Sequence, residues 1–131
     1  METITVVAAI IVNNQQILCV QRPRSKYSYI SEKYEFPGGK IEQGETEEEA
    51  LSREIHEELL LDIQISNKFL TVEHSYPDFT LQMHAYLCKC NTRNIELQEH
   101  ISLKWLARNK LISLDWAAAD VPVVQKLMHR A

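Results

Sequence analysis

The sequence predicts an α/β domain in which helices pack against one mixed β-sheet. Two observations predict this fold class. β-rich segments alternate along the chain with two segments that carry helix start signals, as in folds with strands and helices interleaved around one sheet. The 131 residues suffice for one hydrophobic core and leave no room for a second domain of ordinary size. We therefore expect residues 1–131 to form a single domain.

Composition and charge exclude several classes of protein. Apolar residues make up 45% and charged residues 24%, which is ordinary for a globular chain and unlike a disordered one. Fourteen Lys and Arg against eighteen Asp and Glu give a net charge of −4, without a basic stretch that would bind nucleic acid. The longest apolar run, residues 6–12, is far shorter than the roughly 20 residues that cross a membrane. The first residues lack the basic start of a signal peptide, so we expect a cytoplasmic protein without membrane or nucleic-acid partners.

The first elements are expected to form a hairpin followed by a loop. Residues 5–12 and 16–21 are β-rich, and Asn13-Asn14 between them is a tight-turn sequence. Residues 22–33 are polar and irregular, which indicates a loop.

A short strand and a helix are expected next. Tyr34-Glu35-Phe36 predicts a strand that Pro37-Gly38-Gly39 stops. Thr46 supplies an N-cap oxygen, and the acidic residues 47–49 meet the positive end of the helix dipole. This pattern predicts a helix that ends at about Leu60.

The second half of the chain predicts more strands and a last helix. Residues 81–90 alternate between apolar and polar side chains, which is the period of a half-buried strand. Asp120 followed by Pro122 and an apolar segment predicts a C-terminal helix that Asp120 caps. Further β-rich segments predict strands at residues 63–65, 68–75 and 101–106.

Three glutamates of the first predicted helix, Glu54, Glu57 and Glu58, share one helix face. At 100° per residue their side chains fall within an arc of about 100°. Three like charges at this spacing destabilise a helix unless something positive neutralises them. One interpretation is a solvated acidic face. The other is a site for a hard cation that prefers oxygen ligands, Mg²⁺ or Mn²⁺.

The spacing around these glutamates resembles the Nudix box. Gly39 is followed after five residues by Glu45, and after seven more by the segment 53–61, Arg-Glu-Ile-His-Glu-Glu-Leu-Leu-Leu. Eight of the nine defined positions of the box G-x5-E-x7-R-E-U-x-E-E-x-G-U, where U is aliphatic, agree. The departure is Leu60, where the family has glycine. A left-handed helix C-cap at this position costs a non-glycine residue about 1 kcal/mol.

Segments outside the box extend the resemblance to nearly the whole chain and to the MutT-like nucleoside triphosphate pyrophosphohydrolases of this family. These segments are residues 6–11, 21–23, 34–40 and 119–122. The resemblance implies the Nudix fold, an α/β/α sandwich. It also implies Mg²⁺-dependent hydrolysis of a canonical or oxidised nucleoside triphosphate, such as CTP, dCTP or 8-oxo-dGTP, to the monophosphate and pyrophosphate. Two alternatives stay open: hydrolysis of another diphosphate derivative, such as ADP-ribose or a dinucleoside polyphosphate, and a non-catalytic nucleotide-binding module.

The resemblance also implies a set of metal ligands. These are the carbonyl of Gly38 and the side chains of Glu54, Glu57, Glu58 and Glu99. The implied cofactor is Mg²⁺, with Mn²⁺ as a substitute, and such a cation bridges carboxylates to phosphates and lowers the pKa of a bound water. Glu54 is favoured as the general base. Arg53 and Glu45 are expected to pair and to brace the loop against the helix.

Four further residues are candidates for contacts to a nucleotide substrate. Arg22 and Lys40 are candidate phosphate contacts. Tyr76 takes the place of an aromatic residue near the base in MutT-like enzymes, although an aromatic side chain at a strand end is as often part of the core. Asp120 takes the place of a base-reading amide; an ionised Asp only accepts hydrogen bonds, which suits an exocyclic amine such as cytosine N4. The sequence permits an oligomer without predicting one, and structural roles are expected for His74, His84 and His100.

Overall fold

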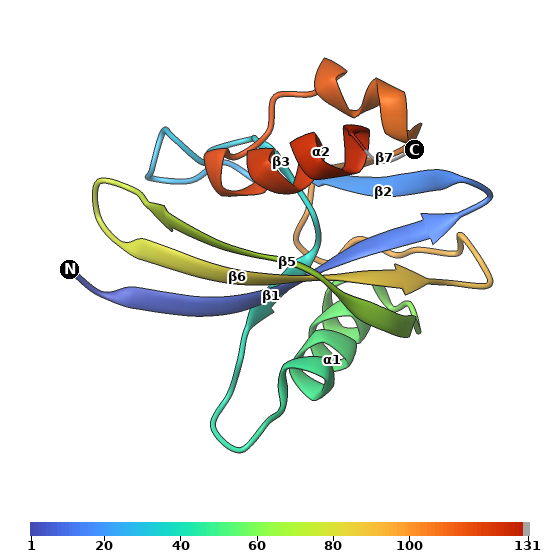
Figure 1. The fold of residues 1–131 in the computed structure, drawn as a ribbon, viewed down its shortest axis with the longest axis horizontal. Coiled ribbons are helices and arrows are strands. Elements are labelled where there is room, and N and C mark those ends of the chain that lie inside the picture. The colour runs from blue at the N-terminus through green and yellow to red at the C-terminus, as the bar shows by residue number, and fades with distance from the viewer. Residues whose placement is uncertain (130–131) are drawn as a thin grey trace.

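A mixed seven-stranded sheet lies between two helices, α1 on one face and α2 on the other (Figure 1). The structure is a computed structural model that describes residues 1–129, so residues 130 and 131 of the expected domain lie outside the described residues. The predicted fold class is confirmed. The strands are β1 (Thr3–Asn13), β2 (Gln16–Gln21), β3 (Tyr34–Glu35), β4 (Gly38–Lys40), β5 (Gln64–Ser75), β6 (Thr80–Lys89) and β7 (Ser102–Ala107). The helices are α1 (Glu47–Leu59) and α2 (Val121–Met128), with 3-10 turns η1 (Arg108–Ser113) and η2 (Ala118–Asp120).

Strand β1 is the centre of the sheet. It pairs with β6 in parallel and with β2 and β4 antiparallel. The strand order is β3-β2-β1-β6-β5, and β7 pairs antiparallel with β2. Because successive residues of a strand face opposite sides, β1 supplies both halves of the core. Val7, Ala9 and Ile11 pack under α1, whereas Ala8 and Ile10 pack under α2.

The opening hairpin is present, but its turn is one residue later than predicted. Asn13 pairs with Gln16 in the ladder, so the two turn residues are Asn14 and Gln15 and not Asn13-Asn14. Both have positive φ, 51° for Asn14 and 64° for Gln15. In a two-residue hairpin turn of this type both turn residues have positive φ. The twist of the turn then matches the twist of the two strands that it joins.

The Pro37-Gly38-Gly39 segment does not simply stop a strand. Gly38 and Gly39 belong to β4, which pairs with Ala8, Val7 and Val6 of β1. A Cβ atom at Gly38 would collide with the carbonyl oxygen of Val7, so only glycine lets the two backbones approach this closely. The sequence rule that reads Pro-Gly-Gly as a breaker missed this close approach.

Helix α1 begins and ends as predicted. The Thr46 side chain accepts a hydrogen bond from the Glu49 amide, and the Glu49 side chain accepts one from the Thr46 amide, which forms a capping box. Leu60 follows the helix in the left-handed conformation, with φ of 50°. The helix therefore keeps the C-cap geometry expected of the family's glycine, with a leucine in that place.

Two strand predictions need correction. The separate strands predicted at 63–65 and 68–75 form one strand, β5, which is interrupted by bulges against β6. Strand β6 was expected to be half-buried, yet Met83 and Ala85 are buried on the α2 face and Tyr86 and Cys88 on the α1 face. Both faces are covered because a helix packs on each side of the sheet.

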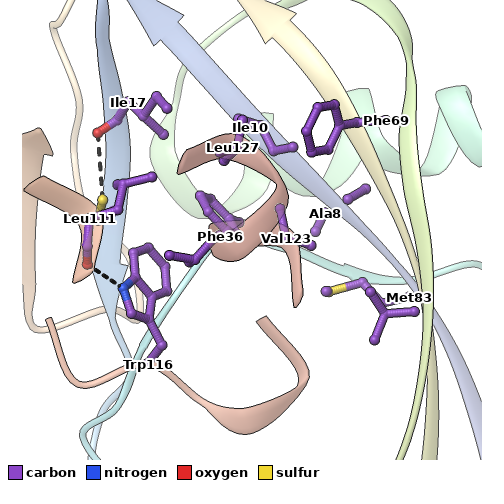
Figure 2. Close-up of a cluster of buried hydrophobic side chains, with 14 residues drawn as sticks. Ala8, Ile10, Ile17, Phe36, Phe69, Met83, Leu111, Trp116, Val123 and Leu127 are labelled. Atoms are coloured by element: carbon purple, nitrogen blue, oxygen red, sulfur yellow. Dashed lines mark hydrogen bonds between the residues drawn. The ribbon is translucent and has the colours of Figure 1, made fainter. Parts of the chain in front are cut away.

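The core on the α2 face is built around an aromatic pair. The Phe36 and Trp116 rings stack with centroids 4.8 Å apart, and Trp116 Nε1 donates a hydrogen bond to the Leu111 carbonyl at 2.7 Å (Figure 2). Val123 and Leu127 of α2 pack into the same cluster. Within residues 1–129, neither helix is long and apolar enough to cross a membrane.

Asp120 is the N-cap residue of α2, as predicted, but the predicted capping hydrogen bond from its side chain is absent. Its side chain makes no capping hydrogen bond, because η2 runs directly into α2 and Asp120 has a helical backbone. The carboxyl instead accepts a hydrogen bond from the Phe36 amide at 3.1 Å. This contact joins the start of α2 to the segment between β3 and β4.

Candidate active site

Arg53 of α1 holds the preceding loop against the helix. Its Nε donates to Glu45 Oε2 at 2.6 Å and its Nη2 donates to Glu45 Oε1 at 2.9 Å, so the expected pair is present as a two-pronged contact. Nη2 also donates to the Lys40 carbonyl at 3.1 Å. The hydrogen bond from Arg53 lowers the pKa of Glu45 to about 2. Arg53 and Glu45 therefore fasten both ends of the segment 40–45.

The same guanidinium contacts two of the three glutamates that share one face of α1. Arg53 Nη1 donates to Glu54 Oε1 at 2.9 Å and to Glu57 Oε2 at 3.3 Å. Glu54 lies so close to β4 that a Cβ atom at Gly39 would collide with its carboxylate. Glu57 is more open, with 56% of its side chain exposed. The residue at position 39 therefore has to be glycine for Glu54 to occupy this place.

Glu58 is half-buried and lines a cavity with residues of β1 and β4. Burial, followed by the nearby carboxylates of Glu35, Glu54 and Glu99, raises the pKa of Glu58 to about 9. Its Oε2 is buried and has no hydrogen-bond partner among residues 1–129. A buried oxygen without a partner is costly, and a cation would satisfy it.

A cavity of about 200 Å³ lies at this end of the sheet. Three of the expected metal ligands, Gly38, Glu58 and Glu99, line it. Glu54 adjoins it across Gly39, which also lines it, and Glu57 lies outside its lining. The remaining charged or polar residues of its wall are Arg22, Glu35, His100 and Asp120.

The Gly38 carbonyl is oriented by the ladder between β4 and β1. The Ala9 amide donates to the Pro37 carbonyl at 2.8 Å, and Gly38 is the next residue along. In an antiparallel ladder, successive residues turn their amide and carbonyl groups to opposite sides. The Gly38 carbonyl is therefore directed away from β1, where it remains available as a ligand.

The expected metal ligands are brought together only in part. Among residues 1–129, no three acidic, histidine or cysteine side chains are arranged so that they could hold a metal ion as they stand. In this arrangement Arg53 binds the carboxylates of Glu54 and Glu57. The donor chemistry nevertheless fits Mg²⁺ or Mn²⁺, because all donors are oxygens and Glu58 Oε2 is buried without a hydrogen-bond partner among residues 1–129.

A second cavity of about 250 Å³ adjoins the first. Arg22, Glu35, Gly39 and Asp120 line both cavities, so they mark the junction. Lys40 lines the second cavity, and the rest of its wall is apolar: Ile4, Val6, Ile30, Tyr76, Phe79, Leu81 and Ala117. The first cavity is therefore acidic, and the second has the apolar walls that suit a planar ring.

Tyr76 is both a core residue and part of a cavity wall, the two roles that the sequence left open. Its ring lines the second cavity but is only 5% exposed and stacks on Tyr29, with centroids 5.2 Å apart. Its hydroxyl accepts a hydrogen bond from the Ala119 amide at 2.9 Å. One side of Tyr76 is thus part of the core, and the residue also forms a cavity wall.

Asp120 is 4% exposed at the junction of the cavities. Burial, followed by the charge of Glu35, raises the pKa of this carboxyl well above its usual range. Burial therefore favours the protonated form, which differs from the ionised Asp expected from the sequence. A protonated carboxyl donates one hydrogen bond and accepts others, as an amide does.

Sequence reasoning missed Glu35 as a site residue and assigned His100 only a structural role. Glu35 Oε1 accepts a hydrogen bond from Arg22 Nη1 at 3.1 Å, and its Oε2 contacts His100 Nε2 at 2.9 Å. The available signal was a charged residue inside the strand Tyr34-Glu35-Phe36, which otherwise carries aromatic side chains. His74 packs against the Tyr76 ring, with centroids 4.5 Å apart, and His84 Nδ1 lies 3.1 Å from the Thr71 hydroxyl.

The fold and the box helix define a hydrolase of Nudix type, and comparison with known proteins agrees. A family model described as NUDIX domain matches residues 6–126. A CTP pyrophosphohydrolase of Escherichia coli (strain K12) is 30% identical over 128 residues, which cover 98% of this chain and 93% of that protein. An 8-oxo-dGTP diphosphatase of the same organism is 31% identical over 127 residues, which cover 97% and 98%.

A solved structure gives the same result. It is the solution NMR structure of DNA mismatch repair protein MutT, family Nudix hydrolase, from methicillin-resistant Staphylococcus aureus 252. It shares 43% identity with this chain, has a TM-score of 0.75, and the match covers 98% of both chains. The chain belongs to the Nudix family, with MutT-like proteins among its relatives. The predicted family and enzyme class are confirmed.

Proposed function

We propose that this chain hydrolyses nucleoside triphosphates to nucleoside monophosphate and pyrophosphate with the help of Mg²⁺. The observation that carries the proposal is the acidic cavity, which is lined both by Arg22 and by Glu58, whose buried Oε2 has no hydrogen-bond partner among residues 1–129. The names of the relatives, CTP pyrophosphohydrolase and 8-oxo-dGTP diphosphatase, support this class of reaction. As part of the same proposal, residues 1–131 act as one domain.

Five residues would hold the metal ion: Gly38 through its carbonyl, and Glu54, Glu57, Glu58 and Glu99 through their side chains. When bound, Mg²⁺ supplies positive charge that attracts the phosphate chain, stabilises the leaving group and lowers the pKa of a water. Arg53 holds the carboxylates of Glu54 and Glu57 side by side. Glu45 in turn fixes Arg53, so both residues support the ligands without touching substrate.

Glu54 is the general base of this proposal. Its carboxylate is fixed by Arg53 on one side and by the close approach of Gly39 on the other. A fixed carboxylate at the rim of the cavity is placed to accept the proton of the water that attacks phosphorus. The oxygen of that water forms the new bond to phosphorus, and the α,β phosphoanhydride bond breaks, which leaves the nucleoside monophosphate and pyrophosphate.

Arg22 and Lys40 contact the phosphates, and the second cavity takes the base. Arg22 lines both cavities, whereas Lys40 lines only the second, beside Gly39. Asp120 reads the base from the junction, and Tyr76 forms part of the wall against which the base lies. Because the Asp120 carboxyl is able to donate as well as accept, an oxidised purine and a cytosine both offer it partners.

A panel of substrates tests the proposed function. Purified protein with Mg²⁺ is incubated with canonical and damaged nucleoside triphosphates, ADP-ribose and dinucleoside polyphosphates, and the products are separated. The proposal expects monophosphate and pyrophosphate in equal amounts from at least one triphosphate. Hydrolysis of only ADP-ribose or dinucleoside polyphosphates, or release of single phosphate groups, would contradict it.

The base-reading role of Asp120 has its own test. Asp120→Asn keeps an acceptor for the Phe36 amide but changes the groups presented to the base. The proposal expects the ranking of kcat/KM among CTP, dCTP, 8-oxo-dGTP and dGTP to change, by about tenfold for at least one pair. An unchanged ranking would show that Asp120 does not choose the base.

A further inference from the structure

Arg22, Glu35 and His100 form a continuous chain of contacts across the acidic cavity. Arg22 Nη1 donates to Glu35 Oε1 at 3.1 Å, and His100 Nε2 lies 2.9 Å from Glu35 Oε2. Each carboxylate oxygen of Glu35 therefore has one partner. Because a carboxylate only accepts, His100 Nε2 carries the hydrogen of this bond.

The backbone fixes the three residues at their places. Glu35 of β3 pairs with Val20 of β2, and the Arg22 amide just beyond β2 donates to the Lys33 carbonyl at 2.9 Å. The Ile101 amide donates to the Gln21 carbonyl at 3.0 Å, which anchors His100 beside the same strand end. The His100 side chain is only 5% exposed. The side chain is therefore almost fully enclosed by the protein where it lines the cavity.

The contact with Glu35 leaves one edge of the Arg22 guanidinium for a ligand. Glu35 binds Nη1, whereas Arg22 Nε is buried and has no hydrogen-bond partner among residues 1–129. Nε and Nη2 together form a planar fork that matches two oxygens of one phosphate group. Arg22 lines both cavities, so its side chain lies where the acidic cavity meets the apolar one.

We propose that His100 is a positioning residue that, through Glu35, fixes the guanidinium of Arg22 to receive a phosphate group of the nucleotide. This inference rests on the proposed function. The carboxyl groups of Glu58, Glu99 and Asp120 line the same cavity. If the Glu35 side chain were free to rotate, these carboxyl groups would compete with it for the Arg22 guanidinium. His100 prevents that rotation because it occupies the second oxygen of Glu35.

A pair of polar substitutions separates the hydrogen bond from simple filling of space. In His100→Gln the side-chain amide reaches about as far as Nε2 and restores a donor to Glu35, whereas in His100→Asn it is too short. We expect His100→Asn to raise KM by about 10- to 100-fold, the cost of a hydrogen bond to a charged group, with little change in kcat. His100→Gln should recover most of this loss. His84→Gln is the matched control, because His84 is also largely buried and lines neither cavity.

A double-mutant cycle with Arg22→Ala tests whether His100 acts through Arg22. The dissociation constant of α,β-methylene-CTP with Mg²⁺ is measured alongside kcat and KM. Arg22→Ala should weaken binding by itself, and His100→Asn should then add less than about a twofold further loss, because the group that it positions is gone. If His100→Asn does not fold, Glu35→Gln replaces it in the cycle with the same expectation.

The outcomes separate this inference from the proposed function. Equal KM for His100→Asn and the wild type, failure of His100→Gln to recover binding, or full additivity with Arg22→Ala would overturn the positioning role. A wild-type protein that binds the analogue but hydrolyses no triphosphate would contradict the proposed function alone, since the binding cycle still tests His100. A wild-type protein that binds none of the α,β-methylene analogues of the triphosphates in the panel would overturn both.

Discussion

The carboxyl of Asp120 is buried between two cavities with a single backbone donor. Its neighbours include Glu35, whose charge adds to the effect of burial and raises the pKa of Asp120 well above the usual range. The folded protein therefore binds a proton at Asp120 that the unfolded chain has already released. This difference makes the stability of the protein depend on pH through one identifiable side chain.

Asp120→Asn should remove that dependence. Above the ordinary Asp pKa of 3.8, and up to the raised pKa of the folded state, the folded wild type binds more protons than the unfolded chain. Its free energy of unfolding therefore falls as the pH rises through this window, whereas an Asn carries no proton to lose. We expect the unfolding midpoint of Asp120→Asn, relative to the wild type, to be higher at about pH 8 than at about pH 5. A difference that is the same at both pH values in thermal unfolding would contradict the raised pKa.

Spacing decides which residue contacts are predictable from the sequence. The pair of Arg53 and Glu45 follows from the box pattern, because a helix start brings a loop glutamate next to a helical arginine eight positions later. The place of Asp120 does not follow, since its sequence context is that of an N-cap and the contact with Phe36 joins residues 84 positions apart. The link between Glu35 and His100 is also distant in sequence, since the two residues are 65 positions apart.

Strand β4 and helix α1 meet where two adjacent glycines have different neighbours. A Cβ at Gly38 would collide with the backbone carbonyl of Val7, whereas a Cβ at Gly39 would collide with the end of the Glu54 side chain. A backbone carbonyl in a central strand has nowhere to move, but a glutamate side chain is able to rotate. The two glycines therefore serve stability and function separately.

Gly38→Ala should mainly reduce stability, whereas Gly39→Ala should mainly reduce kcat. Gly38→Ala forces β4 off β1 and should reduce the free energy of unfolding by about 1–3 kcal/mol or more. Gly39→Ala displaces Glu54, so we expect a smaller loss of stability and a fall in kcat of about 100-fold. Denaturant unfolding and steady-state kinetics measured on both variants check this. Near-normal kcat for a folded Gly39→Ala would show that the position of Glu54 is not critical.

The end of α1 carries strain that the sequence already indicates. Leu60 has a left-handed conformation, with φ of 50°, and its side chain is 46% exposed. Packing of this side chain therefore offsets little of the cost of the left-handed conformation. Leu60→Gly should raise the free energy of unfolding by about 0.5–1 kcal/mol. Leu60→Ala is the matched control, since it loses the same side chain but keeps the strain. Equal stability of the two variants in denaturant unfolding would show that the C-cap is not strained.

Local signals predicted most elements, and tertiary contacts account for the errors. The cap at Thr46 and the acidic residues after it place α1 correctly, because capping is a local interaction. Strand β4 was missed because its glycines are selected by the approach of β1, which the local sequence does not show. The alternation in β6 was misread as a solvent face, since a helix covers each side of the sheet.

At the scale of the molecule, the sheet brings three distant segments to one place. Helix α1 and β4 supply the box, residues 99–100 reach it from the segment before β7, and Asp120 arrives at the start of α2 (Figure 1). The acidic and apolar cavities that result share four polar or glycine residues at their junction. A nucleoside triphosphate has the matching division, with its phosphates at one end and its base at the other.

Binding of Mn²⁺ by the wild type and by Glu58→Gln tests the central claim most directly. Glutamine keeps the volume of Glu58 and carries no charge, and since burial raises the pKa of Glu58 to about 9 the neutral variant should fold. Free Mn²⁺ is followed by electron paramagnetic resonance during a titration of each protein. The account predicts a site in the wild type that is weakened at least about tenfold in Glu58→Gln, with a parallel loss of pyrophosphate release. Equal affinity in the two proteins, or no Mn²⁺ site in the wild type, would contradict it.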